Sequence, residues 1–509
     1  MQIDKITTLG ELKKSGYVSR SVKDEIRANL IKKIQAKQDA FPGILGYEDS
    51  VIPDTERALL SGHNILFLGL RGQAKTRMAR KMIDLLDEYI PIVKGSEIND
   101  DPLNPISAYA KELIADDGDN TPISWLHRSE RYGEKLATPD VSVADLIGDI
   151  DPIKAANLKL SFADERVLHY GIIPRSNRCI FVINELPDLQ ARIQVSLFNL
   201  LEEGDLQIRG FKLRLPLDVL FVFTANPEDY TNRGSIVTPL KDRIESQILT
   251  HYPRSIETSL AITEQEASIA PHRLQRVSVN ELVKRIIEQV AFEARTSELV
   301  DRKSGVSARL TIAAFENAVS AAERRSFIHN ESPTQVWISD LAGIIPAITG
   351  KIELVYEGEQ EGPYQVALNL LERAIRTLFV QYFPDPEALK KRKKNKEGGE
   401  QPDNPYRSVV RWFDSGQHLD IPLDISDEER KTLLYGVDGL HALVKKIHPR
   451  ISTEETPLLM EFVLHGLAAY SLISKKIGEG KLGFKDLMGS MLNLGGRQES
   501  GEEDEQEGY

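Results

Sequence analysis

A glycine-rich turn that ends in a Lys-Thr pair is the segment of this chain whose residues are best suited to chemistry. Residues 69–76 read GLRGQAKT; they follow the apolar run Ile65–Leu68, and a helical pattern starts at Arg77. In such a strand, turn and helix, successive backbone N–H groups and the positive end of the helix can face a polyphosphate. The pattern predicts that Lys75 contacts the β- and γ-phosphates and that the Thr76 hydroxyl ligates Mg²⁺. The alternative is a turn that only caps a helix.

One residue of this turn departs from the usual phosphate-loop pattern. Ala74 stands directly before the lysine, where a glycine is usual. Because its Cβ crowds the backbone, Ala adopts a positive φ less readily than Gly.

Two further apolar runs end in polar residues that could act on a triphosphate. Ile180–Ile183 is followed by Asn184 and Glu185, and Leu220–Ala225 is followed by Asn226. Hydrolysis needs a held metal ion and a polarised water. We expect Glu185 to be the general base and Asn184 to hydrogen-bond a metal-bound water without adding charge. Asn226 would hydrogen-bond the γ-phosphate or the attacking water. The alternatives are buried strands that end in ordinary polar turns.

Two arginines further along the chain could add positive charge to such a site. Arg243 follows Asp242 in a short helical pattern, and Arg309 lies at the start of the helical pattern Ala308–Arg325. From the residues alone, Arg243 is a surface ion-pair partner and Arg309 is a solvated residue of a first helical turn.

The composition is that of a soluble globular protein, since 28% of the residues are charged and 41% are hydrophobic. The formal net charge of −13 argues against a protein that coats nucleic acid without sequence specificity. Cys179 is the single cysteine, which excludes a disulfide framework and a cysteine metal cluster. No apolar run reaches the roughly 20 residues of a membrane span, and no apolar signal core is present. We therefore expect a cytoplasmic protein.

The length of 509 residues predicts two to four domains. Short apolar strands alternate with helices up to about residue 253, which predicts a parallel sheet covered on both faces, and amphipathic helices dominate afterwards. The expected organisation is an N-terminal helical extension (1–40), an α/β nucleotide-binding core (41–254), a helical lid (255–350), a mostly helical C-terminal region (351–498) with a flexible linker near 390–404, and a disordered acidic tail (499–509).

The order of these features resembles an AAA+ ATPase, and more narrowly the branch that holds the magnesium-chelatase motor subunit and the MoxR-type ATPases. The resemblance covers roughly residues 41–325. It includes the segment Phe41–Tyr47 before the first strand and Ala74 before the lysine, which is common in MoxR-type ATPases. It also includes similar sequence segments at 93–105, 146–151 and 200–210. It implies a P-loop parallel sheet with helices on both faces, followed by an all-helical lid and a mostly helical C-terminal region.

The resemblance also implies ATP and Mg²⁺ as cofactors and assigns roles to residues. Arg243 would be the arginine finger, acting in trans on the ATP of a neighbouring subunit, and Arg309 would be the second sensor. Thr76 would ligate the metal directly, and Asn184 would contact it through water. Residues 149–170 would form an insertion in the second helix, and 207–215 a hairpin before Asn226. The implied cofactor-binding residues are Leu45, Gly46, Gly69, Gly72, Gln73, Ala74, Lys75, Thr76 and Arg77.

A finger in trans implies a homo-oligomer, and we expect a hexameric ring that remodels a partner protein. By the same resemblance, the partner is a separate protein with a von Willebrand factor A domain. Two alternatives stay open. The chain could be the motor subunit of magnesium chelatase itself, or a slow or inactive nucleotide-gated scaffold, because Asn184 replaces the usual acid. The net negative charge of the chain argues against a motor that acts on nucleic acid.

Overall fold

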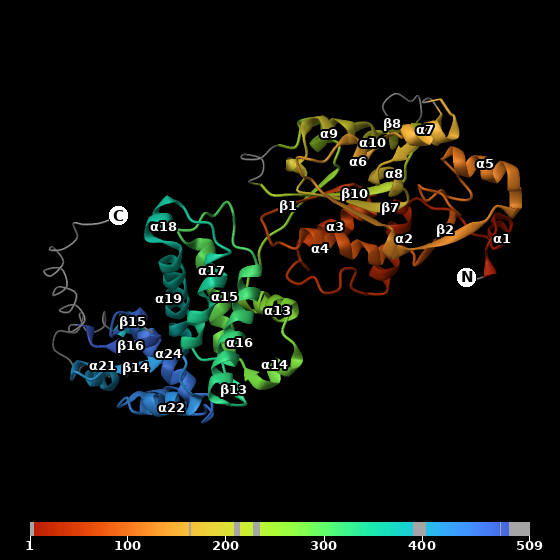
Figure 1. Ribbon diagram of the computed structural model, residues 1–509. Helices are drawn as coiled ribbons and strands as arrows, with labels where there is room; N and C mark the ends of the chain where they lie inside the picture. Colours follow the sequence, from red (N-terminus) through yellow and green to blue (C-terminus); the bar gives the residue numbers. More distant parts are fainter. Residues whose placement is uncertain are drawn as a thin grey trace. The chain divides into compact units, whose positions relative to one another are not determined.

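The computed structural model describes residues 5–161, 164–207, 214–227, 235–389, 404–478 and 480–487. The chain forms two compact units, Met1–Tyr252 and Pro253–Tyr509, drawn in Figure 1. Most of the expected linker near 390–404 and all of the expected acidic tail at 499–509 lie outside the described residues.

The first unit is built on a five-stranded sheet in which every neighbouring pair of strands is parallel. Its strands, in spatial order, are β11 (Ser246–Leu249), β1 (Ile65–Leu68), β10 (Val219–Ala225), β7 (Cys179–Asn184) and β4 (Tyr132–Leu136). The apolar runs expected to be strands at 65–68, 180–183 and 219–224 are β1, β7 and β10. The prediction of a parallel sheet is confirmed.

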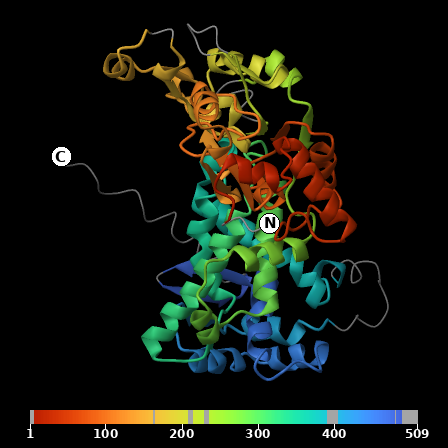
Figure 2. The same cartoon turned by 90° about the vertical axis from the view of Figure 1, so that its right-hand side faces the viewer.

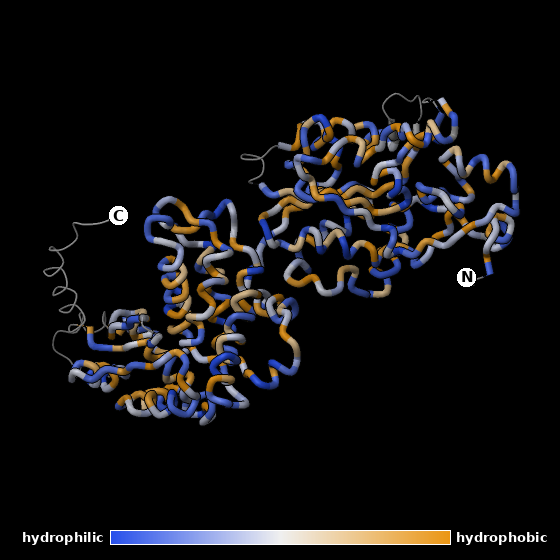
Figure 3. The backbone as a smooth tube through the Cα atoms, viewed as in Figure 1, coloured by the Kyte–Doolittle hydropathy of each residue, from blue (hydrophilic) through white to orange (hydrophobic). Residues whose placement is uncertain are grey.

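Strands β1, β7 and β10 are buried on both faces, which explains why they are apolar without a polar alternation. Ile65 and Phe67 of β1 join one hydrophobic cluster, whereas Leu66 joins the cluster on the opposite face. The strands appear hydrophobic along most of their length in Figure 3. Helices α2 (Val22–Gln35), α3 (Val51–Leu60) and α4 (Lys75–Lys81) lie on one side of the sheet, and α6 (Val143–Leu146), α8 (Ile172–Arg175), α9 (Ala191–Ser196) and α10 (Phe198–Glu202) lie on the other (Figure 1).

The N-terminal segment packs onto this unit. Val22, Ile26 and Leu30 of α2 are buried in the same cluster as Ile65 and Phe67. The buried Glu25 carboxylate forms a bidentate pair with Arg131, with both N–O distances 2.7 Å. The preceding helix α1 (Leu9–Lys14) buries Leu12 beside Ile123. The segment at 1–40 therefore shares the core of the first unit.

Three antiparallel pairs extend the first unit outside the main sheet. They are β2 (Tyr89–Val93) with β3 (Ile123–His127), β5 (Gly148–Ile150) with β6 (Leu168–Tyr170), and β8 (Asp205–Gln207) with β9 (Arg214–Pro216). The β5–β6 pair and α7 (Pro152–Leu158) occupy the segment expected to be an insertion. The β8–β9 pair corresponds to the expected hairpin, whose turn at 208–213 lies outside the described residues. Helices α5 (Ala108–Asp117) and α12 (Thr238–Asp242) complete the unit.

The second unit is mainly helical. Its longest helices are α15 (Glu281–Thr296), α16 (Arg309–His329), α19 (Pro363–Tyr382) and α24 (Thr456–Ala469). The shorter ones are α13 (Ile256–Glu266), α14 (Pro271–Arg276), α17 (Ile345–Thr349), α18 (Tyr356–Glu361), α21 (Arg407–Asp414), α22 (Asp427–Tyr435) and α23 (Leu440–Ile447). Helix α24 is apolar because nearly all of its residues are buried. In the described part of the chain, no helix has the length and apolarity that a membrane crossing requires.

Two short sheets in the second unit were not expected. The parallel pair β12 (Val277–Ser278) and β13 (Thr334–Gln335) lies inside the segment expected to be all helical. An antiparallel sheet of β14 (Leu419–Pro422), β16 (Lys481–Lys485) and β15 (Ser474–Gly478) lies near the C-terminus. Figures 1 and 2 draw this sheet in blue among the helices. The strands were missed because two to five residues carry little periodic signal.

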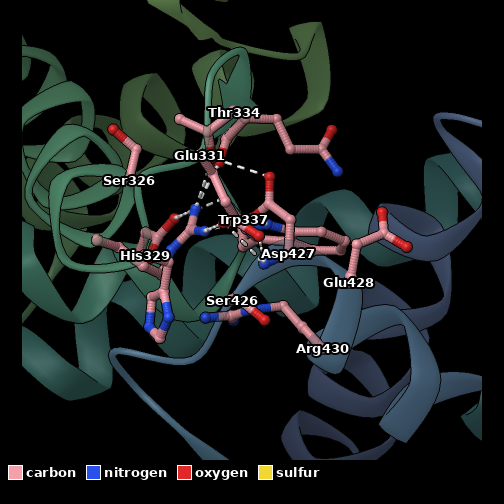
Figure 4. A network of polar contacts seen from close by, with 12 residues as sticks. Ser326, His329, Glu331, Thr334, Trp337, Ser426, Asp427, Glu428 and Arg430 are labelled. Carbon is pink, nitrogen blue, oxygen red and sulfur yellow. Dashed lines mark hydrogen bonds and ion pairs between the residues drawn. The ribbon is translucent and has the colours of Figure 1, made fainter.

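The segments before and after residue 350 share one hydrophobic core, which contains for example Val290, Val319, Leu378 and Phe462. Buried ion pairs also join them. Arg325 of α16 is 1% exposed and pairs with Asp427 of α22 and with Asp340. The same Asp427 accepts hydrogen bonds from Thr334 (2.9 Å) and from the Trp337 indole (2.7 Å), as Figure 4 shows. The expected lid and C-terminal region are thus held together as one unit.

Candidate functional site

The three polar motifs predicted to form a site lie at one edge of the main sheet. Strands β1, β10 and β7 are adjacent and parallel, with Leu68 paired to Ala225 and Phe223 paired to Ile183. The carboxyl ends of parallel strands lie at the same edge, where ligands of open α/β sheets bind. The turn at 69–76 follows β1, Asn226 follows β10, and Asn184 and Glu185 are the last residue of β7 and the residue after it. The sheet order therefore brings them together.

Lys75 is held in direct contact with Asn226. Its ammonium group donates a hydrogen bond to the Asn226 amide oxygen at 2.6 Å and to the Leu70 carbonyl at 2.9 Å, and it also contacts the Gly69 carbonyl. Asn226 is 6% exposed. A lysine ammonium can exchange amide and carbonyl partners for the more negative oxygen atoms of a phosphate.

The backbone of the turn has the left-handed residues that a phosphate loop requires. Gly72 has φ +71°, and Ala74 has φ +54° and ψ +18° directly before the first residue of α4. The departure noted at Ala74 therefore falls on a position that does adopt a positive φ, at a cost of about 1–2 kcal/mol for a non-glycine residue. Gly69 is constrained by space, because a Cβ there would overlap the side chains of Thr250 and Gln73.

Buried hydrogen bonds tie this turn to the segment before the first strand and to the end of β11. The Tyr47 hydroxyl lies within hydrogen-bonding distance of the carbonyls of Gln73 (2.8 Å) and His251 (3.0 Å), and the Thr250 hydroxyl donates to the Gln73 amide oxygen at 2.7 Å. Burial raises the pKa of Tyr47, so this hydroxyl stays a donor. The preceding Gly46 has φ +80°, and its N–H bonds to Glu48.

The implied cofactor-binding set is therefore partly connected in the structure. Leu45 and Gly46 directly precede Tyr47, whose hydroxyl reaches the backbone of Gln73. Arg77 lies in the first turn of α4. Their roles toward a nucleotide stay predictions.

Asn184 lies at the centre of a second group of polar contacts. Its amide oxygen accepts hydrogen bonds from the hydroxyls of Thr76 (3.1 Å) and Thr224 (3.0 Å), and its amide nitrogen donates to the Glu134 carboxylate at 2.7 Å. Asn184 is 8% exposed and Thr224 is 3% exposed. The structure thus places Asn184 against Thr76, as the metal-site prediction requires.

Glu185 adopts a strained conformation at the end of β7. It has φ +56° and ψ +47°, and its N–H donates to the Thr224 hydroxyl at 3.1 Å. A non-glycine residue in this region costs about 1–3 kcal/mol, and such residues concentrate at functional sites. The strain agrees with a functional position, although the role of Glu185 as general base stays a prediction.

Arg243 is engaged elsewhere in its own chain. It pairs with Glu202 at 2.6 Å, donates to the Pro239 carbonyl at 2.9 Å, and lies over the ring of Phe198 at 5.0 Å. It is placed at the C-terminal end of α12. To act on a neighbouring subunit, its guanidinium would have to leave Glu202.

Arg309 is an exposed residue at the start of α16, in the second unit. Its N–H bonds to the Ser307 hydroxyl at 3.1 Å. Its role as second sensor stays a prediction.

Three residues of the site were missed by sequence reasoning, namely Glu134, Thr224 and Thr250. Glu134 lies in β4, opposite Val182, and reaches Asn184 because β4 and β7 are neighbours in the sheet. The run 132–136 reads YGEKL and lacks the apolar pattern of a buried strand. Thr224 lies within a predicted strand, and only its position opposite Asn184 distinguishes it from other buried threonines.

The residues around Asn184 fit a magnesium ion. Thr76 offers a hydroxyl oxygen, Asn184 an amide oxygen, and Glu134 a carboxylate directly behind the amide. Oxygen atoms are the ligands that Mg²⁺ prefers, with water completing its shell. When bound, such an ion would neutralise phosphate charge. Among the described residues, no group of three or more His, Cys, Asp or Glu is arranged to hold a metal by itself.

At the level of sequence, the chain matches no family model and no curated protein. Several solved structures are similar to it at low identity. A Cytophaga hutchinsonii protein described as an ATPase is 17% identical, with a TM-score of 0.29, and the match covers 71% of this chain and 97% of that one.

A model of the magnesium-chelatase complex of subunits BchI and BchD is 19% identical, with a TM-score of 0.33 and coverage of 63% and 98%. NtrX from Brucella abortus, solved with ADP, is 13% identical, with a TM-score of 0.35 and coverage of 76% and 71%.

The assignment of the fold depends on features of the chain itself. The sheet has the order β11-β1-β10-β7-β4, the phosphate-loop pattern follows strand β1, and the polar ends of β7 and β10 meet that loop. By this sheet and its helical second unit, the chain is an α/β protein with a phosphate-loop pattern, and the order of its motifs resembles that of AAA+ ATPases of the magnesium-chelatase and MoxR branch.

Proposed function

We propose that this protein binds and hydrolyses ATP with Mg²⁺ and uses the reaction to remodel a partner protein. The observation that carries the proposal is the contact of Lys75 with Asn226 and of Thr76 with Asn184, at the end of adjacent strands. A phosphate loop alone gives nucleotide binding, whereas hydrolysis also needs a metal site and a base beside it. Glu185 directly follows Asn184 and supplies the base.

Each side chain has a separate task in this proposal. The Lys75 ammonium and the N–H groups of the turn hold the β- and γ-phosphates. The Glu185 carboxylate takes a proton from the attacking water, and the Asn226 amide orients that water or the γ-phosphate. The Thr76 hydroxyl and, through water, the Asn184 amide oxygen would hold a magnesium ion, which would neutralise phosphate charge.

The oligomeric part of the proposal depends on Arg243. Its guanidinium would complete the site of the adjacent subunit, and Arg309 would be the second sensor. Such an arrangement requires a homo-oligomeric ring, which we propose is hexameric and cytoplasmic. By the resemblance to the MoxR and chelatase branch, the partner would be a separate protein with a von Willebrand factor A domain.

The proposal is tested by measuring nucleotide affinity and steady-state ATP hydrolysis for the wild type, Lys75→Ala and Glu185→Gln. We expect Lys75→Ala to lose nucleotide binding, and Glu185→Gln to keep binding while hydrolysis falls by about 10²–10⁴-fold. Lys81→Ala, in the last turn of the same helix, is the matched control.

Two other results would change the conclusion. Equal, near-background hydrolysis in the wild type and Glu185→Gln, with binding intact, would support the nucleotide-gated scaffold instead. Binding that Lys75→Ala leaves unchanged would contradict nucleotide binding at this loop. The partner is tested by identifying what co-purifies with Glu185→Gln in the presence of ATP, and recovery of chelatase subunits would support the magnesium-chelatase alternative.

A further inference from the structure

The orientation of the Asn184 amide decides what this residue can offer to a metal ion. An asparagine presents an acceptor oxygen at one end of its amide and a donor NH₂ at the other. Only the oxygen end can face a cation or accept a hydrogen bond from metal-bound water. An aspartate, usual at this place in the motif, has no such ambiguity.

The three neighbours of Asn184 differ in how strongly they constrain it. Thr76 and Thr224 both face its oxygen, but a hydroxyl can donate or accept and would adapt to either end of the amide. Glu134 faces its nitrogen at 2.7 Å. An ionised carboxylate can only accept, so Glu134 admits the donor end alone. Of these contacts, the one with Glu134 therefore fixes the amide.

The Glu134 carboxylate is itself held in place. Its Oε2 accepts from Arg80 Nε (3.0 Å) and from the Tyr132 hydroxyl (3.0 Å), and Arg80 Nη2 reaches both oxygens at 2.9 and 3.1 Å. Each of these contacts is from a donor. The Arg80 side chain is 61% exposed, so water screens its pairing with Glu134, while the Glu134 side chain is 24% exposed.

We propose that Glu134 is a positioning residue that turns the Asn184 oxygen toward Thr76. The negative charge of the site then lies on Glu134, behind Asn184, and not on residue 184 itself. The pair of Glu134 and Asn184 would then stand where a single aspartate is usual. This inference rests on the proposed function, because it concerns the magnesium site of the same nucleotide.

The pairing predicts that the effect of changing Glu134 depends on the residue at 184. With Asn184 present, Glu134→Gln replaces the carboxylate by an amide that can present either end, so it no longer fixes Asn184. With Asn184→Asp present, Glu134 instead faces a second carboxylate, and like charges in contact oppose one another. There, Glu134→Gln relieves the repulsion and supplies a donor to Asp at 184.

The experiment measures how much Mg²⁺ tightens the binding of mant-ADP, as the ratio of its Kd values in EDTA and in MgCl₂. The four proteins are wild type, Glu134→Gln, Asn184→Asp and the double variant. In the Asn184 background we expect Glu134→Gln to lower the ratio about tenfold, within the usual 10–100-fold effect of residues that orient metal ligands. In the Asn184→Asp background the same change should leave the ratio unchanged or raise it.

Glu130→Gln is the matched control, since it removes an exposed carboxylate four residues earlier and should leave the ratio unchanged. An unchanged ratio for Glu134→Gln, or an equal decrease in both backgrounds, would overturn the inference, because independent sites give additive effects. If Glu134→Gln is unfolded by circular dichroism, Glu134→Ala is compared in the same two backgrounds. If the wild type binds no mant-ADP, or if Lys75→Ala binds it equally well, the proposed function itself fails.

Discussion

The Lys75 ammonium lies 2.6 Å from the Asn226 amide oxygen, and this hydrogen bond joins the turn after β1 to the end of β10. The two residues are 151 positions apart in the chain. Their contact places a cation and a neutral polar side chain at the same point of the sheet edge. Several consequences of this and of other buried polar contacts can be measured.

Asn226→Asp should weaken ATP binding at least tenfold, whereas Asn226→Ala should keep it. The aspartate would hold Lys75 in an ion pair, stronger than the present hydrogen bond by about 1 kcal/mol or more, and would also repel the phosphates. Both variants should hydrolyse ATP slowly. Titration with mant-ATP checks the prediction. Equal affinities for the two variants would show that Lys75 is not the residue that holds the phosphates.

Arg243→Ala should reduce ATP turnover by about 10³–10⁵-fold while leaving ATP affinity intact, because an arginine finger acts on the transition-state charge. Arg57→Ala is the control, since Arg57 is exposed on α3 and pairs only locally with Asp54. A mixing experiment tests the action in trans. Neither Arg243→Ala nor Lys75→Ala should be active alone. In rings formed from equal amounts of the two variants, about a quarter of the interfaces combine an intact Lys75 with an intact Arg243 of the neighbouring subunit, and these should regain activity.

If the mixed rings stay inactive, or if Arg243→Ala turns over ATP normally, Arg243 is not a finger in trans. Its present contacts with Glu202 and Phe198 would then be its structural role.

Asp218 should make the stability of the protein depend on pH between about 4 and 6. Burial raises the pKa of this carboxyl to about 6, although its hydrogen bond from the Val22 N–H and the charge of Arg178 act in the opposite direction. The folded protein then holds a proton that the unfolded chain releases. The stabilisation is present below pH 4 and is lost as the pH rises to 6.

Asp218→Asn should remove this dependence, because the amide oxygen can still accept from Val22 and carries no titrating group. Urea unfolding of both proteins at pH 4, 5, 6 and 7 measures it. We expect the difference in unfolding free energy to change by about 1–3 kcal/mol over this range, at about 1.4 kcal/mol per pKa unit. A difference that is constant with pH would contradict the prediction.

Arg325→Ala should destabilise the second unit by about 3–5 kcal/mol, because it leaves the carboxylates of Asp427 and Asp340 buried without their cation. Its neighbour Arg324 provides a matched control. Arg324 is 64% exposed and pairs with Asp424, so Arg324→Ala should cost no more than about 1 kcal/mol. Urea unfolding compares the two variants. Similar small losses would show that the buried network contributes little to joining the segments before and after residue 350.

The amino-acid sequence by itself determined three strands of the main sheet, β1, β7 and β10, and the polar residues at their ends. The runs at 65–68, 180–183 and 219–224 are apolar except for Thr224 because these strands are covered on both faces, and a continuous apolar run is a strong local signal. The helices α15, α16 and α19 were also recognisable, since each is long enough to repeat its buried positions.

Only the tertiary structure decided which of these residues meet. Strand order is set by packing among segments far apart in the chain, and the sequence contains no local signal for it. Glu134 became part of the site because β4 pairs with β7, and Arg325 meets Asp427 because α16 and α22 pack in one core. Such contacts depend on the burial of charged and apolar side chains against partners far apart in the chain. A short stretch of sequence does not show which distant residue will be the partner.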